Sequence, residues 1–229
     1  MTKGINTFNE KPLHLALKKW YAQPGDALET EVDGFIVDII HNGLLIEIQT
    51  RNFSAIKRKL TTLLKHYHVL LVYPIAQEKW LVKTARDAQH PESRRKSPKR
   101  GTVMEVFTEL VSIPHLLTNP NFSLEVALIQ EEEVRSYDPK RGWRRHGWVT
   151  QERRLLHVVS QLRFNSPSDF ARLIPSQLPT SFSTADLAQA LGRSRRFAQR
   201  VAYCLRKMDL IAACGKQGNA ILYKRVHVK

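Results

Sequence analysis

The sequence of 229 residues contains only two cysteines, Cys204 and Cys214. They do not form a Cys-x-x-Cys pair, and no cysteine–histidine cluster has the spacing of a zinc finger. The pattern therefore argues against a structural zinc site. We expect two reduced, packed thiols, as is usual for proteins of the cytosol.

The sequence also lacks long apolar runs. No segment approaches the roughly 20 apolar residues that a membrane-spanning helix needs. The first residues carry no apolar stretch of the kind found in secretory signals. Together these absences predict a cytosolic protein with no membrane partner.

Acidic residues are scarce relative to basic ones. The chain has 36 Lys and Arg residues against 21 Asp and Glu residues, for a formal net charge of +15. Each phosphate that a Lys or Arg neutralises releases condensed counterions, so this charge favours polyanionic partners. It predicts a nucleic-acid-binding, nucleoid-associated protein; a chain bound to ribosomes or to a membrane surface is the alternative.

Helical and strand periodicities alternate in the first part of the chain, which predicts a mixed α/β (α+β) domain at residues 1–134. Asn42-Gly43 lies between two apolar runs, which is a strong signal for a β-hairpin. A polar, basic loop is expected at residues 87–101. The expected helices lie at 12–21, 54–66 and 102–117, and the expected strands at 35–40, 44–48, 68–75, 79–84 and 122–130.

A second basic stretch, residues 135–150, is interpreted as a linker that leads to a C-terminal domain at residues 151–229. Two tryptophans in this stretch lie among arginines. They could stack on nucleic-acid bases, or they could anchor the linker to a domain. The residues concerned are Trp143, Trp148, Arg144 and Arg145.

The C-terminal end contains a clear succession of motifs. Ser183 and Asp186 fit a capping box at the start of a helix that stops at Gly192. A second, basic helix is expected at residues 194–208. A glycine-rich turn at residues 215–219 then separates two short runs, which predicts a β-hairpin.

This succession resembles the winged helix-turn-helix family over residues 180–229. The resemblance implies binding of double-stranded DNA, with the second helix in the major groove. A winged helix that contacts protein instead is the alternative. The residues expected to contact DNA are Arg193, Arg195, Arg196, Gln199, Arg200 and Tyr203 on the helix and Lys216 at the hairpin tip.

The predicted hairpin at Asn42-Gly43 brings acidic residues together. Because side chains alternate along a strand, Glu47 and Gln49 share a face, and a two-residue turn places Asp38 directly opposite Glu47. Two carboxylates that face one another between apolar neighbours are unfavourable, because they repel and lose water, unless a cation offsets this cost. Mg²⁺ or Mn²⁺ would do so with oxygen ligands; a polar strand face in water is the alternative.

In this region the chain resembles the PD-(D/E)XK nuclease superfamily, also called restriction-endonuclease-like, over about residues 9–85. The matching features are a helix, a hairpin with Asp38 before its turn and Glu47 after it, a second helix and a buried strand. The lysine of the Glu-x-Lys motif, which in that superfamily is thought to position or activate the attacking water, is Gln49 here. Compared with the Glu-x-Lys motif of that superfamily, the motif of this chain is therefore Glu47-x-Gln49.

Several further residues are candidates for this site. Lys59 is the first replacement for the missing lysine, and Lys57 is the second. Glu10 is a weak match to a glutamate that the superfamily often carries on its first helix. Asp33 is an alternative metal ligand to Asp38 if a bulge near Gly34 turns it toward the metal.

We therefore expect a metal-dependent DNA endonuclease or nickase that is targeted by its own winged helix. Asp38 and Glu47 would hold Mg²⁺ or Mn²⁺, Gln49 would orient the attacking water, and Lys59 would supply positive charge. A homodimer is compatible with this role, because cutting both strands commonly uses two active sites. The alternative is a catalytically degenerate DNA-binding regulator or accessory protein of a defence, recombination or mobile-element system.

Overall fold

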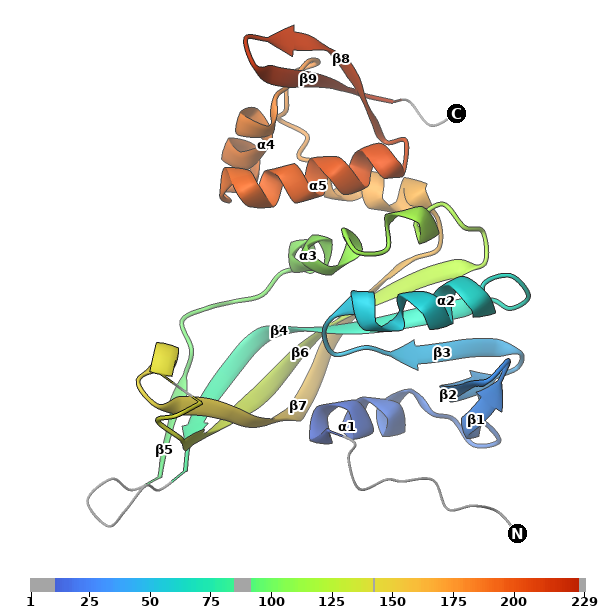
Figure 1. Ribbon diagram of the computed structural model, residues 1–229, viewed down its shortest axis with the longest axis vertical. Helices are drawn as coiled ribbons and strands as arrows, with labels where there is room; N and C mark the ends of the chain where they lie inside the picture. Colours follow the sequence, from blue (N-terminus) through green and yellow to red (C-terminus); the bar gives the residue numbers. More distant parts are fainter. Residues whose placement is uncertain (1–10, 85–91, 142, 227–229) are drawn as a thin grey trace.

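The computed structural model describes residues 11–84, 92–141 and 143–226, apart from the side chain of Arg145 (Figure 1). Its architecture is mixed α/β, with helices on both faces of a seven-stranded mixed sheet. None of the described helices is both long enough and apolar enough to cross a membrane.

The elements follow one another in two groups. The first group consists of α1 (Pro12–Tyr21), β1 (Ala27–Val32), β2 (Phe35–His41), β3 (Leu44–Ile48), the 3-10 helix η2 (Phe53–Ile56), α2 (Lys57–Leu63), β4 (Val69–Lys83) and β5 (Ser93–Lys96). The second consists of η3 (Val103–Val106), α3 (Phe107–Leu110), η4 (Pro114–Leu116), β6 (Phe122–Tyr137), η5 (Trp143–Arg145), β7 (Trp148–Phe164), η6 (Pro167–Leu173), α4 (Thr184–Leu191), α5 (Arg195–Lys207), β8 (Ile211–Gln217) and β9 (Ala220–Arg225).

The main sheet has the strand order β1-β2-β3-β4-β6-β7, with β5 also paired to β4. β1, β2 and β3 form an antiparallel meander, β4 and β6 continue it in parallel to β3, and β7 is antiparallel to β6. The helix α1 packs Leu13 and Leu17 into the core on one face, while α2 and α3 pack on the other face (Figure 1). The sheet is therefore covered on both sides near β3.

The hairpin predicted at Asn42-Gly43 is confirmed. Asn42 and Gly43 both have positive φ, 49° and 83°, as a two-residue turn of this kind requires. Ile39 pairs with Ile46, and His41 pairs with Leu44. This register fixes which residues of β2 face which residues of β3.

Two of the predicted boundaries that were wrong concern the long strands of the sheet. The strands expected at 68–75 and 79–84 are one strand, β4, with an irregularity between Ala76 and Glu78. The predicted linker at 135–150 contains the end of β6 and the start of β7, so residues 151–164 belong to the sheet rather than to a C-terminal domain. Residues 135–150 look like a linker because they are highly charged, but their two ends continue β6 and β7, which pair opposite charges next to them, as in Glu133 with Arg153.

The C-terminal unit consists of α4, α5 and the β8–β9 hairpin. The Ser183 hydroxyl accepts hydrogen bonds from the Ala185 and Asp186 amides, as the predicted capping box requires. The helix α4 ends at Gly192 with a φ of 60°. The hairpin is tied back to the start of the unit by the bridge between Phe182 and Tyr223.

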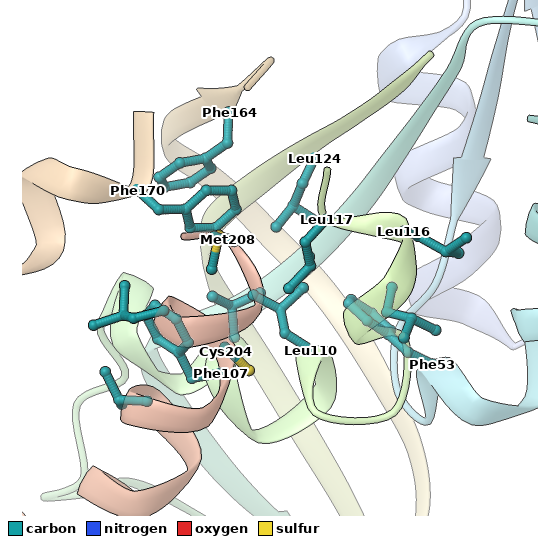
Figure 2. Close-up of a cluster of buried hydrophobic side chains, with 14 of the residues drawn as sticks. Phe53, Phe107, Leu110, Leu116, Leu117, Leu124, Phe164, Phe170, Cys204 and Met208 are labelled. Atoms are coloured by element: carbon teal, nitrogen blue, oxygen red, sulfur yellow. The ribbon is translucent and has the colours of Figure 1, made fainter. Parts of the chain in front are cut away.

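The C-terminal unit shares its core with the sheet domain. Figure 2 shows Cys204 of α5 close to Phe107 and Leu110 of α3, and Met208, which follows α5, close to Phe170. Phe170 of η6 stacks on the ring of Phe164, at the end of β7, with centroids 4.3 Å apart. The two parts are therefore joined by buried apolar surface.

Candidate functional site

The predicted carboxylates lie together at the centre of the covered sheet. Asp38 is on β2, Glu47 is on β3, and Lys59 reaches them from α2. His14 approaches Asp38 from α1 on the other face. We call these four residues the Asp38–Glu47 cluster.

Asp38 lies at an irregular point of β2. The β1–β2 ladder is interrupted beside it, where Glu29 adopts a left-handed φ of 47°. Val37 and Ile39 consequently pack into the cores on opposite faces of the sheet, although alternate residues of a regular strand share a face. The Asp38 side chain is thereby able to interact with groups from both layers.

Asp38 accepts its hydrogen bonds on one oxygen. The Ile48 backbone N–H lies 2.8 Å from Oδ2, and His14 Nε2 lies 3.2 Å from the same atom. Burial alone would raise the pKa of Asp38, but the hydrogen bond and charge of His14 and the bond from Ile48 outweigh it and lower the pKa. Asp38 is therefore ionised at neutral pH.

Glu47 is almost fully buried, with 5% of its surface exposed. The ammonium of Lys59 contacts its Oε1 atom and the backbone carbonyl of Ile36. Burial raises the pKa of Glu47, and the charge of Asp38 raises it further. Lys59 opposes both effects, and the resulting pKa is about 7.

The donor set of this cluster suits a hard divalent cation. Mg²⁺ is commonly held by one or two carboxylates, with water and phosphate oxygens completing its shell. Asp38 and Glu47 supply two such carboxylates, and a cation between them would relieve the repulsion that raises the pKa of Glu47. Among the described residues no group of three or more Asp, Glu, His or Cys side chains could hold a metal, so any metal here would rest on these two.

The structure separates the other predicted residues of this site from the cluster. Gln49 donates from Nε2 to the Asn52 carbonyl, 3.0 Å away. Asp33 is exposed in the β1–β2 turn with a φ of 49°, so the bulge proposed near Gly34 does not turn it toward Glu47. Lys57 is exposed at the start of α2. Glu10 lies outside the described residues.

His14 was missed by the sequence analysis. It lies on α1, the helix on which the superfamily often carries a glutamate. The resemblance predicted a carboxylate on this helix, whereas the side chain that meets Asp38 is the imidazole of His14. The helical periodicity of α1 could be recognised in the sequence, but the contact of His14 with Asp38 depends on how this helix crosses the sheet.

The predicted DNA-contacting residues of α5 form an exposed stripe. Arg195, Arg196, Gln199 and Tyr203 are exposed, and Arg200 is half-buried. The opposite side of α5 packs in the shared core through residues such as Cys204. Lys216 is exposed on β8, in the hairpin.

Three more predicted contacts lie near the sheet. Arg193 forms an ion pair with Glu105. Arg144 lies over the ring of Trp143, with 4.7 Å between its guanidinium and the ring centroid. The side chain of Arg145 lies outside the described part of the chain.

A large groove opens beside these residues, with a volume of about 1440 Å³. It is lined by β4, β6 and β7, by the segments around η5 and η3, and by Arg193 at the start of α5. None of the residues of the Asp38–Glu47 cluster lines it. This groove was not predicted from the sequence, because residues 135–150 have the charged composition of a linker.

Comparison with known proteins places the chain in a family. A family model described as "Domain of unknown function (DUF8091)" matches residues 11–165, which run from α1 to the end of β7. An uncharacterized protein of Treponema pallidum (strain Nichols) is 31% identical over 223 residues, covering 96% of this chain and 87% of the relative. No solved structure matches.

Proposed function

We propose that this chain, which belongs to the DUF8091 family, is a metal-dependent DNA endonuclease or nickase. The observation that carries the proposal is the Asp38–Glu47 cluster. It holds two neighbouring carboxylates and a lysine in a buried part of the sheet, where such groups are costly unless they are used or compensated.

The arrangement of elements supports a restriction-endonuclease-like core. The order of α1, the β2–β3 hairpin, α2 and the buried strand β4 is the order that the PD-(D/E)XK resemblance implies. Asp38 precedes the hairpin turn and Glu47 follows it, as that motif requires. Likeness of fold alone does not imply activity, so the proposal depends on the chemistry of the cluster.

In the proposed mechanism Asp38 and Glu47 hold Mg²⁺ or Mn²⁺. When bound, such an ion polarises the scissile phosphate and lowers the pKa of a coordinated water. The Ile48 amide and His14 keep Asp38 ionised and fix its orientation. Lys59 contributes a positive charge beside Glu47 and thereby stands in for the missing lysine of Glu-x-Lys.

We further propose that the C-terminal unit is a winged helix that targets the nuclease to double-stranded DNA. The supporting observations are the exposed basic stripe of α5 and the β8–β9 hairpin that follows it. Arg196, Gln199 and Tyr203 are spaced three and four residues apart, so they line one side of the helix. That side could enter a major groove.

A plasmid-nicking assay tests the nuclease proposal. The purified chain should convert supercoiled plasmid to open-circular or linear DNA with Mg²⁺ or Mn²⁺ and not with EDTA. Glu47→Gln keeps the shape of the side chain and should abolish the conversion, whereas Glu31→Gln, an exposed β1 carboxylate, should not. Nicking that persists in Glu47→Gln would assign the activity to a contaminant and refute the proposed site.

One observation favours a second candidate, a DNA-binding regulator or accessory protein without catalysis. Gln49 stands where the superfamily has lysine, and its amide is engaged by the Asn52 carbonyl. On this account Lys59 merely neutralises Glu47. Specific duplex binding with no metal-dependent nicking at any metal concentration would favour this candidate.

A further inference from the structure

The strands β4, β6 and β7 continue past α2 and α3 as a twisted arm that carries β5 and η5 (Figure 1). The large groove described above lies along this arm and reaches the start of α5. Its residues play no part in the proposed hydrolysis. The groove can therefore be considered as a site of its own.

The groove is strongly basic. Its lining contains ten Lys and Arg side chains against two carboxylates, Glu105 and Glu133. Within the described residues, five of the ten have no acidic partner, and all five are exposed. They are Arg51, Arg95, Lys99, Arg141 and Arg144.

The floor of the groove is fixed by buried ion pairs. Lys79 Nζ lies 3.0 Å from Glu131 and 2.8 Å from Glu133, and Arg153 lies 2.6 Å from Glu131. Both glutamates are buried. Because these floor charges largely cancel, most of the attraction for an anion comes from the unpaired cations of the rim.

An exposed tryptophan stands at the rim. Trp143 is 70% exposed, and its only described ring contact is the guanidinium of Arg144. The two other tryptophans of the arm are less exposed and lie beside cations: Trp80 near Arg94 and Lys96, and Trp148 near Lys83. A large ring held in water beside arginines offers a stacking surface for a nucleobase.

We propose that this groove binds an unpaired nucleic-acid strand, with Trp143 as a base-stacking platform and the rim cations on the phosphates. Inside a duplex the base faces are stacked on one another, so the ring of Trp143 has access to base faces along an unpaired strand but not within a duplex. The proposal does not depend on the proposed nuclease activity. It assigns the strand a place that is separate from both the Asp38–Glu47 cluster and the exposed stripe of α5.

Fluorescence anisotropy of the full chain in EDTA tests the proposal with labelled oligo(dT) and oligo(U) of about 20 nucleotides and a duplex of the same length. Trp143→Ala should weaken binding of the single strand roughly tenfold, within the range of about 1–3 kcal/mol per stacked base. Trp143→Phe should retain most of the affinity, and duplex binding should change less than about twofold. Trp20→Ala, which removes an exposed tryptophan on α1, is the matched control.

Dependence on Trp143 with either oligo(dT) or oligo(U) supports the proposal, and comparison of the two identifies the sugar that the groove prefers. Arg51→Gln should lower the salt dependence of single-strand binding by about 0.7 in slope, because one phosphate contact is lost. The proposal is overturned if Trp143→Ala binds both single strands as tightly as the parent. It is equally overturned if Trp143→Ala and Trp20→Ala weaken binding by the same factor.

Discussion

At the scale of single residues, Asp38 and Glu47 show how two carboxylates can coexist in a buried sheet. Their pKa values move apart: that of Asp38 is lowered, and that of Glu47 is raised to about 7. The difference arises because Asp38 receives the Ile48 N–H and His14, whereas Glu47 is buried beside the charge of Asp38. One carboxylate therefore holds its charge while the other titrates near neutral pH.

This interpretation predicts how the pKa of Glu47 responds to its neighbours. Asp38→Asn removes the nearby negative charge, so the pKa of Glu47 should fall below about 7. Lys59→Met removes the favourable positive charge, so the pKa should rise. The pH titration of the Glu47 carboxyl carbon by NMR in metal-free buffer measures both shifts, and shifts of the same sign would contradict the account.

The sequence was sufficient to predict the hairpin that carries these residues but not all of their partners. Asn42-Gly43 determines the hairpin and the register in which Ile39 pairs with Ile46. The approach of His14 depends on how α1 crosses the sheet, which no local pattern specifies. The exposure of Asp33 follows from a second turn, Asp33-Gly34, in which both residues have positive φ.

At the scale of elements, the long strands β4, β6 and β7 are held together by charged pairs as well as by apolar contacts. Burial alone would raise the pKa of Glu133. The hydrogen bond and charge of Lys79 outweigh burial and, with Thr150 and Arg135, lower the pKa to about 2. The sheet arm is therefore stabilised by an ionised glutamate.

Stability should depend on pH through this residue. Glu133 ordinarily has a pKa of about 4.5, so its contribution is present above that pH and is lost as the pH falls toward about 2. At a pH near 6, the free energy of unfolding of Glu133→Gln should be lower than that of the parent by at most about 3 kcal/mol. Near pH 2 the two proteins should have the same free energy of unfolding. Urea unfolding of both proteins across this range measures it.

The matched control for this prediction is Glu152→Gln. Glu152 pairs with Arg154 on the exposed side of β7, and exposed ion pairs contribute only about 0–1 kcal/mol. If the parent and Glu133→Gln differ in free energy of unfolding by the same amount at every pH, the lost stability does not come from the charge of Glu133.

Charge also explains why these elements were hard to predict. Alternation of apolar and polar residues is the usual sign of a strand, but Arg153 and Arg154 of β7 pair with Glu133 and Glu132 of β6, so the strands are charged on both faces. Such a stretch resembles a solvated linker in the sequence. The helix α5 was predictable because its apolar side keeps a helical spacing.

At the scale of the whole molecule, the sheet domain and the C-terminal unit unfold as one body on this account. Phe170 is buried between Phe164 of β7 and Phe107 of α3, and α5 packs on the same core (Figure 2). Contacts of this kind join residues far apart in the chain and leave no local pattern in the sequence. They explain why the predicted division at 135–150 was misplaced.

The shared core predicts a single unfolding transition. In a Cys214→Ser background, reaction of the buried Cys204 thiol reports on α5, and tryptophan fluorescence reports on the sheet domain. The two probes should give the same urea midpoint. Phe170→Ala should move both midpoints together and cost about 3–5 kcal/mol. Exposure of Cys204 at lower urea than the fluorescence change would show two independent domains.

The central claim is that Asp38, Glu47 and Lys59 act as one phosphodiester-cleaving site. Its most direct test is the single-turnover rate of plasmid nicking with Mn²⁺ in Lys59→Met and in Lys57→Met, which remove neighbouring lysines of the same helix. The account predicts a rate at least about a hundredfold lower for Lys59→Met, the lower range for a positioned catalytic group, and a rate within about twofold of the parent for Lys57→Met. Equal rates in the two variants, or loss of activity in Lys57→Met alone, would contradict it.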